Sequence, residues 1–481
     1  MDSFGFKNFR KFEDFPMMEL GGINIFVGKN NSGKSTAIKV LNTIADNFAN
    51  TTSYYGEQPD GILEPPIHYS SFKLSSASDY LDINNPTIPY MEFSFRVGET
   101  NVIVRLFKKS ANGDAAKRVL IINRGQISYQ YDLQESKVRC SITIDDIESR
   151  KSLISSLEKQ LENIEKQMSD LNHENVTRQL ERTKKAWEQR YEAIKASINH
   201  VDLKTNIVEI DLPLRLRQPE ITTTNVYLKE LLSPVNTLIK NDLLEITATT
   251  NISAHGITRD RFISLKNQDD VFAQLISHNS LISGKSGQPN PWLKHFEIGD
   301  DLEVKDITNL GEIFTIDVIR GEKHIPVSNM GTGAIQLIQL LMFNPVYMNN
   351  NEYRNILIIE EPEQNLHPAL QSKLADYFYN FYLESYYNSE THERSEWPVK
   401  LIIETHSEYL IRRLQVIAAT LMKSGERTLE EINRDFKVYY FPENGSPYSM
   451  GFHKDGRFTR PFGTGFVDEA GKHYLQLLDM Q

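Results

Sequence analysis

The chain contains a single cysteine, Cys140, in 481 residues. One cysteine excludes an internal disulfide and any zinc site built from several cysteines. No apolar run approaches the roughly 18 residues that a membrane-spanning helix needs. The first residues, MDSFGFKNFRKFEDF, also lack the long apolar core of a secretory signal. These absences predict a cytoplasmic protein that makes no use of the membrane.

Positive charge is also scarce. The 53 lysine and arginine residues are outnumbered by 64 acidic residues, which gives a formal net charge of −11. A protein coated for non-specific binding of nucleic acid would carry the opposite balance, although a local basic groove for DNA stays compatible with this composition. With 40% hydrophobic and 24% charged residues, the sequence is typical of a globular protein that can bury one large core or two to three modest ones.

A phosphate-binding loop is present near the start of the chain. Residues 28–35, GKNNSGKS, fit the pattern G-x-x-x-x-G-K-[ST], with an apolar strand before them and helical residues 37–48 after them. The glycines let successive amide groups turn toward a phosphate, and the following helix points its positive end at the same place. We expect Lys34 to bind the β and γ phosphates of a nucleotide, Ser35 to hold Mg²⁺, and Thr36 to reach the α phosphate. The predicted binding set is Gly28, Asn30, Asn31, Ser32, Gly33, Lys34, Ser35 and Thr36.

Two acidic residues follow a second apolar strand, ILII at residues 356–359. A run of four apolar residues indicates a buried parallel strand, and ligands bind at the carboxyl ends of such strands. We predict that Glu360 holds Mg²⁺ through water and that Glu361 orients or polarises the attacking water. The alternative is a buried strand with a solvated acidic end.

A third apolar strand ends close to a histidine, in the sequence KLIIETHS at residues 400–407. A histidine at this edge can hydrogen-bond a γ phosphate and sense its loss. On its own such a histidine would more often be structural. Because His406 follows the acidic pair by about 45 residues, we predict that it belongs to the catalytic site.

Small residues begin another helical stretch, in the sequence SNMGTGAIQ at residues 328–336. Gly331, Thr332 and Gly333 at a helix start would form a second anion site. A second phosphate-binding helix tip is redundant in one ATPase unless it serves the nucleotide of another subunit. The alternative is an ordinary loop followed by a core helix.

In this order, the motifs resemble those of the ATP-binding-cassette (ABC) ATPases of the Rad50/SMC and OLD group. NFRKF at 8–12 is similar to the opening of that group. EEPEQNLHP at 360–368 is similar to its acidic strand and D-loop, with Glu363 to His367 as the D-loop. MGTGAIQ at 330–336 stands where a signature such as LSSGEKQ would stand, with Gly331 in place of the signature serine. The resemblance implies an α/β fold, an ABC-ATPase head in which a mixed central sheet with the phosphate loop is joined by an antiparallel β lobe. It also implies that Gly331 to Gly333 contact ATP held by a second subunit, in a homodimer or higher homo-oligomer of heads.

The middle of the chain changes period twice. Residues 88–132 alternate between polar and apolar, which predicts an antiparallel meander. Apolar residues at three- and four-residue spacing from Ile147 to Leu171, and less regularly from Leu180 to Ile198, predict a short antiparallel coiled-coil hairpin. Two amphipathic helices packed on the head are the alternative. We therefore expect the head to comprise residues 1–145 and 201–481, interrupted by a hairpin at 146–200.

Chemistry beyond that of ATP is not evident in the sequence. The 75 residues after His406 contain no Asp-x-Asp pair of the kind that a TOPRIM nuclease uses, and there is no HNH-type cluster of histidines. The motifs resemble the ATPase subunits of bacterial anti-phage systems, first of the Septu type, which pairs with an HNH nuclease, and second of the PARIS type, which pairs with a TOPRIM nuclease. The resemblance implies a slow ATPase that senses infection and controls a separate nuclease. The alternative is an SMC- or Rad50-like DNA clamp in repair, for which Arg259 and Arg261 are candidate contacts if they are not simply solvated.

Overall fold

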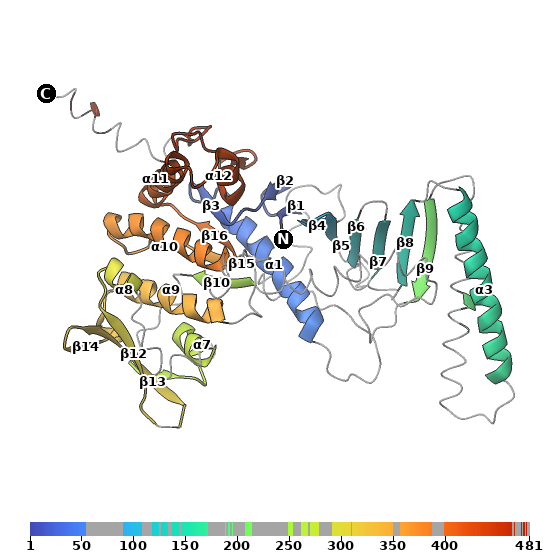
Figure 1. The fold of residues 1–481 in the computed structure, drawn as a ribbon, viewed down its shortest axis with the longest axis horizontal. Helices are drawn as coiled ribbons and strands as arrows, with labels where there is room; N and C mark the ends of the chain where they lie inside the picture. Colours follow the sequence, from blue (N-terminus) through green and yellow to red (C-terminus); the bar gives the residue numbers. More distant parts are fainter. Residues whose placement is uncertain are drawn as a thin grey trace. The chain divides into compact units, whose positions relative to one another are not determined.

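The computed structural model describes most of the chain in segments. They are residues 1–53, 90–107, 118–124, 127–132, 137–143, 147–171, 207–213, 249–253, 261–267, 270–278, 291–308, 310–349, 356–386 and 399–463, with single residues between 188 and 195 and between 466 and 478. They fall into two compact units, residues 1–19 with 39–247 and residues 20–38 with 248–481, each with its own sheets (Figure 1). Within these segments, no helix is long and apolar enough to cross a bilayer.

The first unit is built on an antiparallel sheet of eight strands, in the order β2-β1-β4-β5-β6-β7-β8-β9 (Figure 1). Its core is rich in phenylalanine, with Phe4, Phe6, Phe93 and Phe95 almost completely buried. The meander predicted for residues 88–132 is confirmed as β4 to β7. The strands are β1 (Ser3–Phe9), β2 (Phe12–Glu19), β4 (Tyr90–Val97), β5 (Thr100–Phe107), β6 (Arg118–Arg124), β7 (Ile127–Asp132), β8 (Lys137–Thr143) and β9 (Ile207–Pro213).

A long helix, α3 (Ile147–Leu171), is inserted between β8 and β9, which pair with each other directly. Its apolar face includes the buried Ile164, and its other positions are mostly charged or polar. The hydroxyl of Tyr191, from the predicted second arm, donates to Glu165 Oε1 of α3 at 2.7 Å. The first predicted arm is therefore a helix, while most of the second arm lies outside the described residues. The predicted limits of the insertion, 146 and 200, fall just before α3 and ahead of β9.

The second unit contains a sheet of six strands in the order β10-β15-β16-β3-β17-β18, of which the first five run parallel. The inner strands read as continuous apolar runs because helices cover both faces of a sheet of this kind. Their carboxyl ends therefore meet at one edge. The strands are β10 (Thr249–Ser253), β15 (Ile356–Glu360), β16 (Lys400–Glu404), β3 (Ile23–Gly28), β17 (Phe436–Phe441) and β18 (Tyr448–Ser449).

Helices α1, α10 and α11 directly follow strands β3, β15 and β16 of this sheet. Ser407 caps α11 by accepting from the amide of Leu410 at 3.1 Å, and Gly425 ends the helix in the left-handed conformation. Because Ser407 directly follows His406, this cap fixes where the chain leaves β16. The helices are α1 (Lys34–Ser53), α7 (Val271–His278), α8 (Pro291–His295), the 3₁₀ turn η4 (Val327–Asn329), α9 (Thr332–Asn349), α10 (Pro368–Tyr386), α11 (Glu408–Ser424) and α12 (Leu429–Asp435).

A smaller antiparallel sheet leads into α9. It consists of β11 (Ile263–Ser264), β12 (Asp301–Asp306), β13 (Ile313–Arg320) and β14 (Lys323–Pro326). Strands β13 and β14 form a hairpin whose turn contains Gly321, with a φ of +56°. Since β14 runs through η4 directly into α9, this sheet determines where the glycine-rich start of α9 lies.

Candidate nucleotide site

The phosphate loop leaves β3 in a conformation that requires glycine. Gly28 has a φ of +152° and Gly33 a φ of +102°. A Cβ atom on Gly28 would lie 2.3 Å from the carbonyl oxygen of Phe441 on the neighbouring strand β17. The loop then turns into α1, where the amides of Thr36 and Ala37 both donate to the carbonyl of Gly33 at 3.1 Å. Close packing against β17 therefore excludes a side chain at Gly28, and the positive φ favours glycine at Gly33.

The interior of the loop is polar. Lys34 is buried, and its Nζ donates to the carbonyls of Gly28 at 3.0 Å and Lys29 at 3.1 Å. The hydroxyl of Ser32 is also buried and has no hydrogen-bond partner among the described residues. Ser35 is exposed, as are Asn30 and Asn31. A buried ammonium, an unsatisfied hydroxyl and a helix start in one loop fit the phosphates of a nucleotide.

The acid in contact with this loop is Glu404, at the end of β16. Its Oε1 accepts from Ser35 Oγ at 3.1 Å and lies 3.8 Å from Lys34 Nζ. Burial raises the pKa of Glu404 to about 7, against the opposing effect of Lys34 and with a further increase from Glu360. Glu404 was not among the predicted site residues. The signal was present, since KLIIE at 400–404 has the same form as ILIIE at 356–360.

Glu360 lies at the end of β15, directly opposite Glu404 in the parallel register of β15 and β16. Its side chain is partly exposed. Hydroxyl and carboxylate oxygens are the ligands that Mg²⁺ prefers, usually with several waters retained. Ser35 and Glu360 therefore fit the predicted metal-binding roles, with Glu404 beside them.

Glu361 and His406 lie together at the same edge. His406 Nε2 is 3.8 Å from Glu361 Oε1, and the side-chain amide of Gln364 donates to the other carboxylate oxygen. Glu361 adopts a φ of +49°, which is uncommon for a non-glycine residue, and its amide donates to the carbonyl of Glu404 at 2.8 Å. Burial lowers the pKa of His406, and the Lys34 cation acts in the same direction, so the imidazole is neutral at pH 7. A neutral imidazole can donate one N–H to a phosphate oxygen.

Two further buried residues support this pair. The backbone amide of His406 donates to Glu363 Oε1 at 2.6 Å. Gln336 of α9 donates through Nε2 to the carbonyl of Glu361 at 3.1 Å. The sequence placed Glu363 in the D-loop without a role of its own, and it gave no role to Gln336 or Gln364. In the sequence, Gln336 stands out only as a glutamine within the apolar stretch AIQLIQLL, and the structure buries it.

The predicted signature residues lie at the start of α9. Gly331, Thr332 and Gly333 line a cavity of about 310 Å³ together with Asn365 and Leu366 of the predicted D-loop. A Cβ atom on Gly333 would lie 2.5 Å from the carbonyl oxygen of Asn365, so α9 approaches the D-loop as closely as its backbone permits. The contact of these residues with the nucleotide of a second subunit stays a prediction.

The comparison with known protein families decides the class of this site. Residues 1–411 match the family described as AAA ATPase domain. The chain belongs to this family. An ATPase domain binds ATP, typically with Mg²⁺, and the residues gathered at the sheet edge fit both. No curated protein matches the chain.

Two solved structures are similar to this AAA ATPase domain protein. One is the Smc head domain of Pyrococcus furiosus with an extended coiled coil, bound to the C-terminal domain of ScpA, at a TM-score of 0.39 and 10% identity over 99% of both chains. The other is the SMC head domain of Thermotoga maritima, at a TM-score of 0.31 and 10% identity over 94% of this chain and 98% of that chain.

Replacing Glu363 with glutamine is expected to stabilise the ATPase domain at pH 8, and to do so less at pH 5. Burial raises the pKa of Glu363 above its usual value of 4.5. Its contribution to stability is therefore fully present below that value and is lost as pH rises through the raised pKa. The glutamine variant keeps the acceptor for the His406 amide and avoids the buried charge. Urea unfolding at pH 5 and pH 8 measures the effect, and a variant whose gain is the same at both pH values would contradict it. Glu363→Ala, which also removes the acceptor, should be less stable than wild type.

The two glycines at the start of α9 form a matched pair for a second prediction. Gly333→Ala should destabilise the protein by about 2 kcal/mol, because the added methyl group meets backbone and side-chain atoms of the D-loop within 3 Å. Gly331→Ala should change stability by less than about 0.5 kcal/mol, since no atom lies within 4 Å of its added Cβ. Thermal unfolding of both variants tests this. Equal stability of the two would show that α9 does not press against the D-loop.

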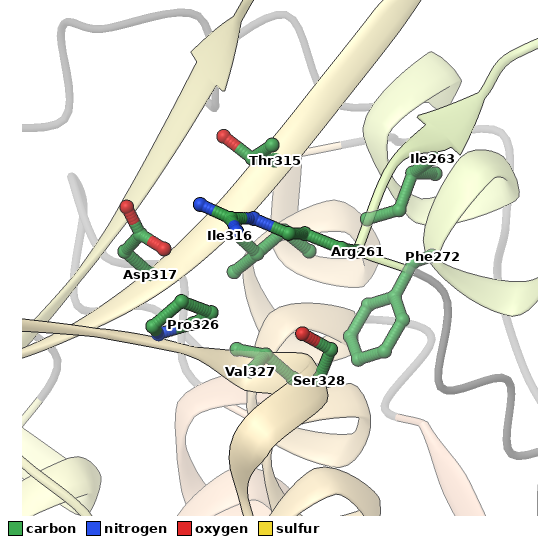
Figure 2. Close-up of a pocket in the computed structure, with 9 residues that line it drawn as sticks. All are labelled: Arg261, Ile263, Phe272, Thr315, Ile316, Asp317, Pro326, Val327 and Ser328. Atoms are coloured by element: carbon green, nitrogen blue, oxygen red, sulfur yellow. The ribbon is translucent and has the colours of Figure 1, made fainter.

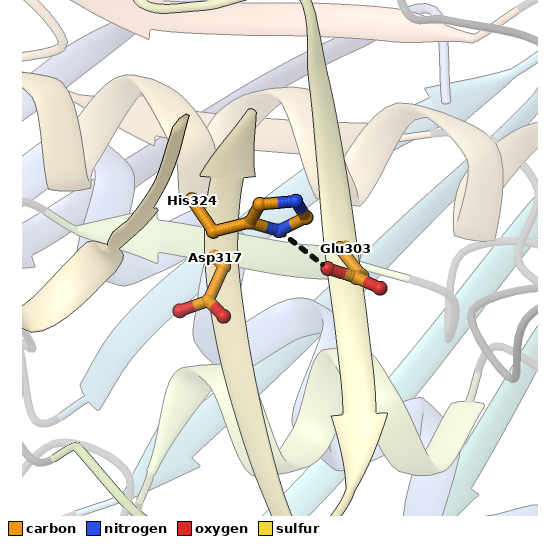
Figure 3. A group of neighbouring side chains, drawn as sticks. All are labelled: Glu303, Asp317 and His324. Carbon is orange, nitrogen blue, oxygen red and sulfur yellow. Dashed lines mark ion pairs between the residues drawn. The ribbon is translucent and has the colours of Figure 1, made fainter. Parts of the chain in front are cut away.

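A cluster outside the nucleotide site contains three residues of the kinds that bind metals. Figure 3 shows Glu303 of β12, Asp317 of β13 and His324 of β14 side by side, with His324 Nδ1 2.8 Å from Glu303 Oε2. Lys305 Nζ lies 2.7 Å from the same oxygen, and its hydrogen bond lowers the pKa of Glu303. The lysine already supplies the positive charge that two facing carboxylates need. We therefore assign this cluster to ion pairing on the surface of the sheet.

The small pocket beside β13 involves one of the arginines considered for phosphate or DNA. Figure 2 shows Arg261 extended across this pocket, which Phe272 and Ser328 also line. Its volume of about 10 Å³ has room for about one water molecule, so it is not a nucleotide pocket. Arg261 is exposed, and its guanidinium lies 5.9 Å from the centre of the Phe262 ring. Arg259 lies outside the described residues.

Proposed function

We propose that the chain is an ATP-binding, slowly hydrolysing sensor subunit of a cytoplasmic anti-phage defence complex and that it controls a separate nuclease. The observation that carries the ATPase part is the edge of the parallel sheet, where Lys34 and Ser35 meet Glu404 and where Glu361 meets His406. The defence part rests on the motifs that resemble Septu-type ATPases.

The proposed reaction uses these residues in separate roles. Lys34 and the loop amides bind the phosphates, and Ser35 with Glu360 would hold Mg²⁺, which supplies neutralisation of charge on the β and γ oxygens. Glu361 accepts a proton from water as the water oxygen attacks the γ phosphorus and the bond to the β–γ bridging oxygen breaks. His406 donates a hydrogen bond to the γ phosphate and so responds to its departure.

Slow turnover is supported by the state of Glu361. One oxygen of its carboxylate accepts a hydrogen bond from Gln364, and the other lies 3.8 Å from His406 Nε2. Its left-handed backbone is held from both sides, by the carbonyl of Glu404 and by Gln336. The attacking water must therefore share this carboxylate with Gln364 and His406. Gly331, at the position of the signature serine, also removes one hydroxyl donor for phosphate.

Control of a partner would use two nucleotide states. In the proposed complex, heads associate in pairs around ATP, with Gly331 to Gly333 of one subunit against the γ phosphate bound by the other. Hydrolysis then shifts the assembly between two states, and a nuclease that binds one state better is held or released accordingly. We favour an HNH nuclease over a TOPRIM nuclease as this partner.

The test is purification of the tagged full-length chain together with the proteins encoded beside it, followed by mass photometry with and without ATP. The proposal predicts a nuclease in a fixed ratio and a change of mass with ATP. An ATP-dependent dimer without a partner, which retains DNA in a salt-sensitive manner, would instead establish an SMC-like DNA clamp.

A further inference from the structure

One carboxylate touches both residues of the phosphate loop that carry its chemistry. Glu404 accepts from the Ser35 hydroxyl at 3.1 Å and faces the Lys34 ammonium at 3.8 Å. It is 4% exposed, whereas Ser35 is exposed. Glu404 therefore lies behind the serine, on the side of the sheet interior, and Ser35 stands between it and solvent.

This placement matters for a hydroxyl that binds a cation. A serine hydroxyl has one hydrogen and two lone pairs, so a hydroxyl that offers a lone pair to a cation must direct its hydrogen to another acceptor. Residues that accept hydrogen bonds from metal ligands fix the orientation of those ligands. The Ser35 hydroxyl already points at such an acceptor, because its Oγ lies 3.1 and 3.4 Å from the two carboxylate oxygens of Glu404.

We propose that Glu404 is a positioning residue of the Mg²⁺–ATP site, which takes the Ser35 hydrogen and so turns the serine lone pairs toward the cation. Lys34 fits this role, because its ammonium keeps the carboxylate in place while also donating to the carbonyls of Gly28 and Lys29. The inference rests on the ATP site and is independent of any role in defence.

The experiment measures the binding of mant-ATP to the full-length chain, first in EDTA and then during a Mg²⁺ titration. Glu404→Ala should raise the Mg²⁺ concentration for half-maximal binding by about 10- to 100-fold. Its affinity for mant-ATP in EDTA should stay within about 3-fold of wild type, since without free Mg²⁺ the cation contributes to nucleotide binding in neither protein. Ser35→Ala should show the same pattern. The double variant should be no weaker than Ser35→Ala alone, because the two side chains act through one hydrogen bond.

Glu404→Gln separates positioning from direct ligation. The Lys34 ammonium favours the amide oxygen on its own side, where this oxygen still accepts from Ser35, so the Mg²⁺ requirement should stay within about 3-fold of wild type. A loss as large as that of the alanine variant would show that Glu404 binds the cation itself and would overturn the proposal. The proposal would also be overturned if the two single losses in Mg²⁺-dependent binding added up in the double variant, or if Glu404→Ala needed no more Mg²⁺ than wild type. If the alanine variant does not fold, the glutamine variant decides alone. Wild-type binding without any Mg²⁺ dependence would contradict the site as a whole, a failure separate from that of Glu404.

Discussion

Lys34→Ala is expected to lower the affinity for ATP by more than about 100-fold. The substitution removes the buried cation that binds the phosphates, and loss of one member of such a charge pair costs about 2–5 kcal/mol of binding free energy. It should also destabilise the protein without nucleotide. The ammonium of Lys34 lies 3.8 Å from Glu404, and both side chains are 5% exposed or less. Loss of the lysine leaves a buried carboxylate without its cation, which costs up to about 3 kcal/mol at pH 8, where Glu404 is ionised.

The cost of Lys34→Ala should depend on pH in a definite direction. The pKa of Glu404 is raised to about 7, from its usual value of 4.5. Glu404 therefore favours the folded state at low pH, and this contribution is lost as pH rises through about 7. The lysine opposes that loss by attracting the ionised form, so its removal should matter more at pH 8 than at pH 6. Urea unfolding of both proteins at the two pH values measures this. An equal cost at both values would contradict the pairing of Lys34 with Glu404.

A double substitution provides the control. Lys34→Met with Glu404→Gln removes both charges and keeps similar side-chain volumes, so stability at pH 8 should recover relative to Lys34→Ala. ATP binding should stay lost, because the phosphate partner is absent in both. A double variant that binds ATP as tightly as wild type would show that the phosphates are bound elsewhere.

Glu361→Gln is expected to reduce ATP hydrolysis by about 100- to 1,000-fold while leaving ATP affinity within about 3-fold of wild type. The substitution keeps the shape of the side chain and removes its ability to accept a proton. Because ATP then persists, the proposed pair of heads should accumulate in its ATP-bound form, which mass photometry detects. Glu426→Gln, which changes an exposed acid after α11, serves as the control and should hydrolyse ATP normally. Wild-type hydrolysis by Glu361→Gln would remove Glu361 from the catalytic role.

The phosphate loop and the strands around it could be predicted because their signals are local. The GKNNSGKS spacing fixes the turn at Gly28, and the runs ILII and KLII indicate buried parallel strands whose ends share one edge. These features depend on neighbours in sequence.

Glu404 could not be assigned in that way, because its role depends on a neighbour 369 residues away. The sequence shows an acid after an apolar strand at both Glu360 and Glu404, and only the placement of β16 beside β3 brings the second acid to Ser35. Gln336 was missed for a related reason. Its helix is apolar on all sides, so periodicity could not show that this glutamine faces the backbone of Glu361.

The decisive experiment identifies the nucleotide that stays on the protein, and so tests whether Lys34 binds ATP and Glu361 is needed to hydrolyse it. Each of three proteins, wild type, Lys34→Ala and Glu361→Gln, is mixed with radiolabelled ATP and Mg²⁺ for a single turnover. A rapid desalting column then removes free nucleotide, and chromatography separates the ATP and ADP that stay bound. We expect ADP on the wild-type protein, unconverted ATP on Glu361→Gln and no nucleotide on Lys34→Ala. ADP formed on Glu361→Gln at the wild-type rate, or ATP retained by Lys34→Ala, would contradict it.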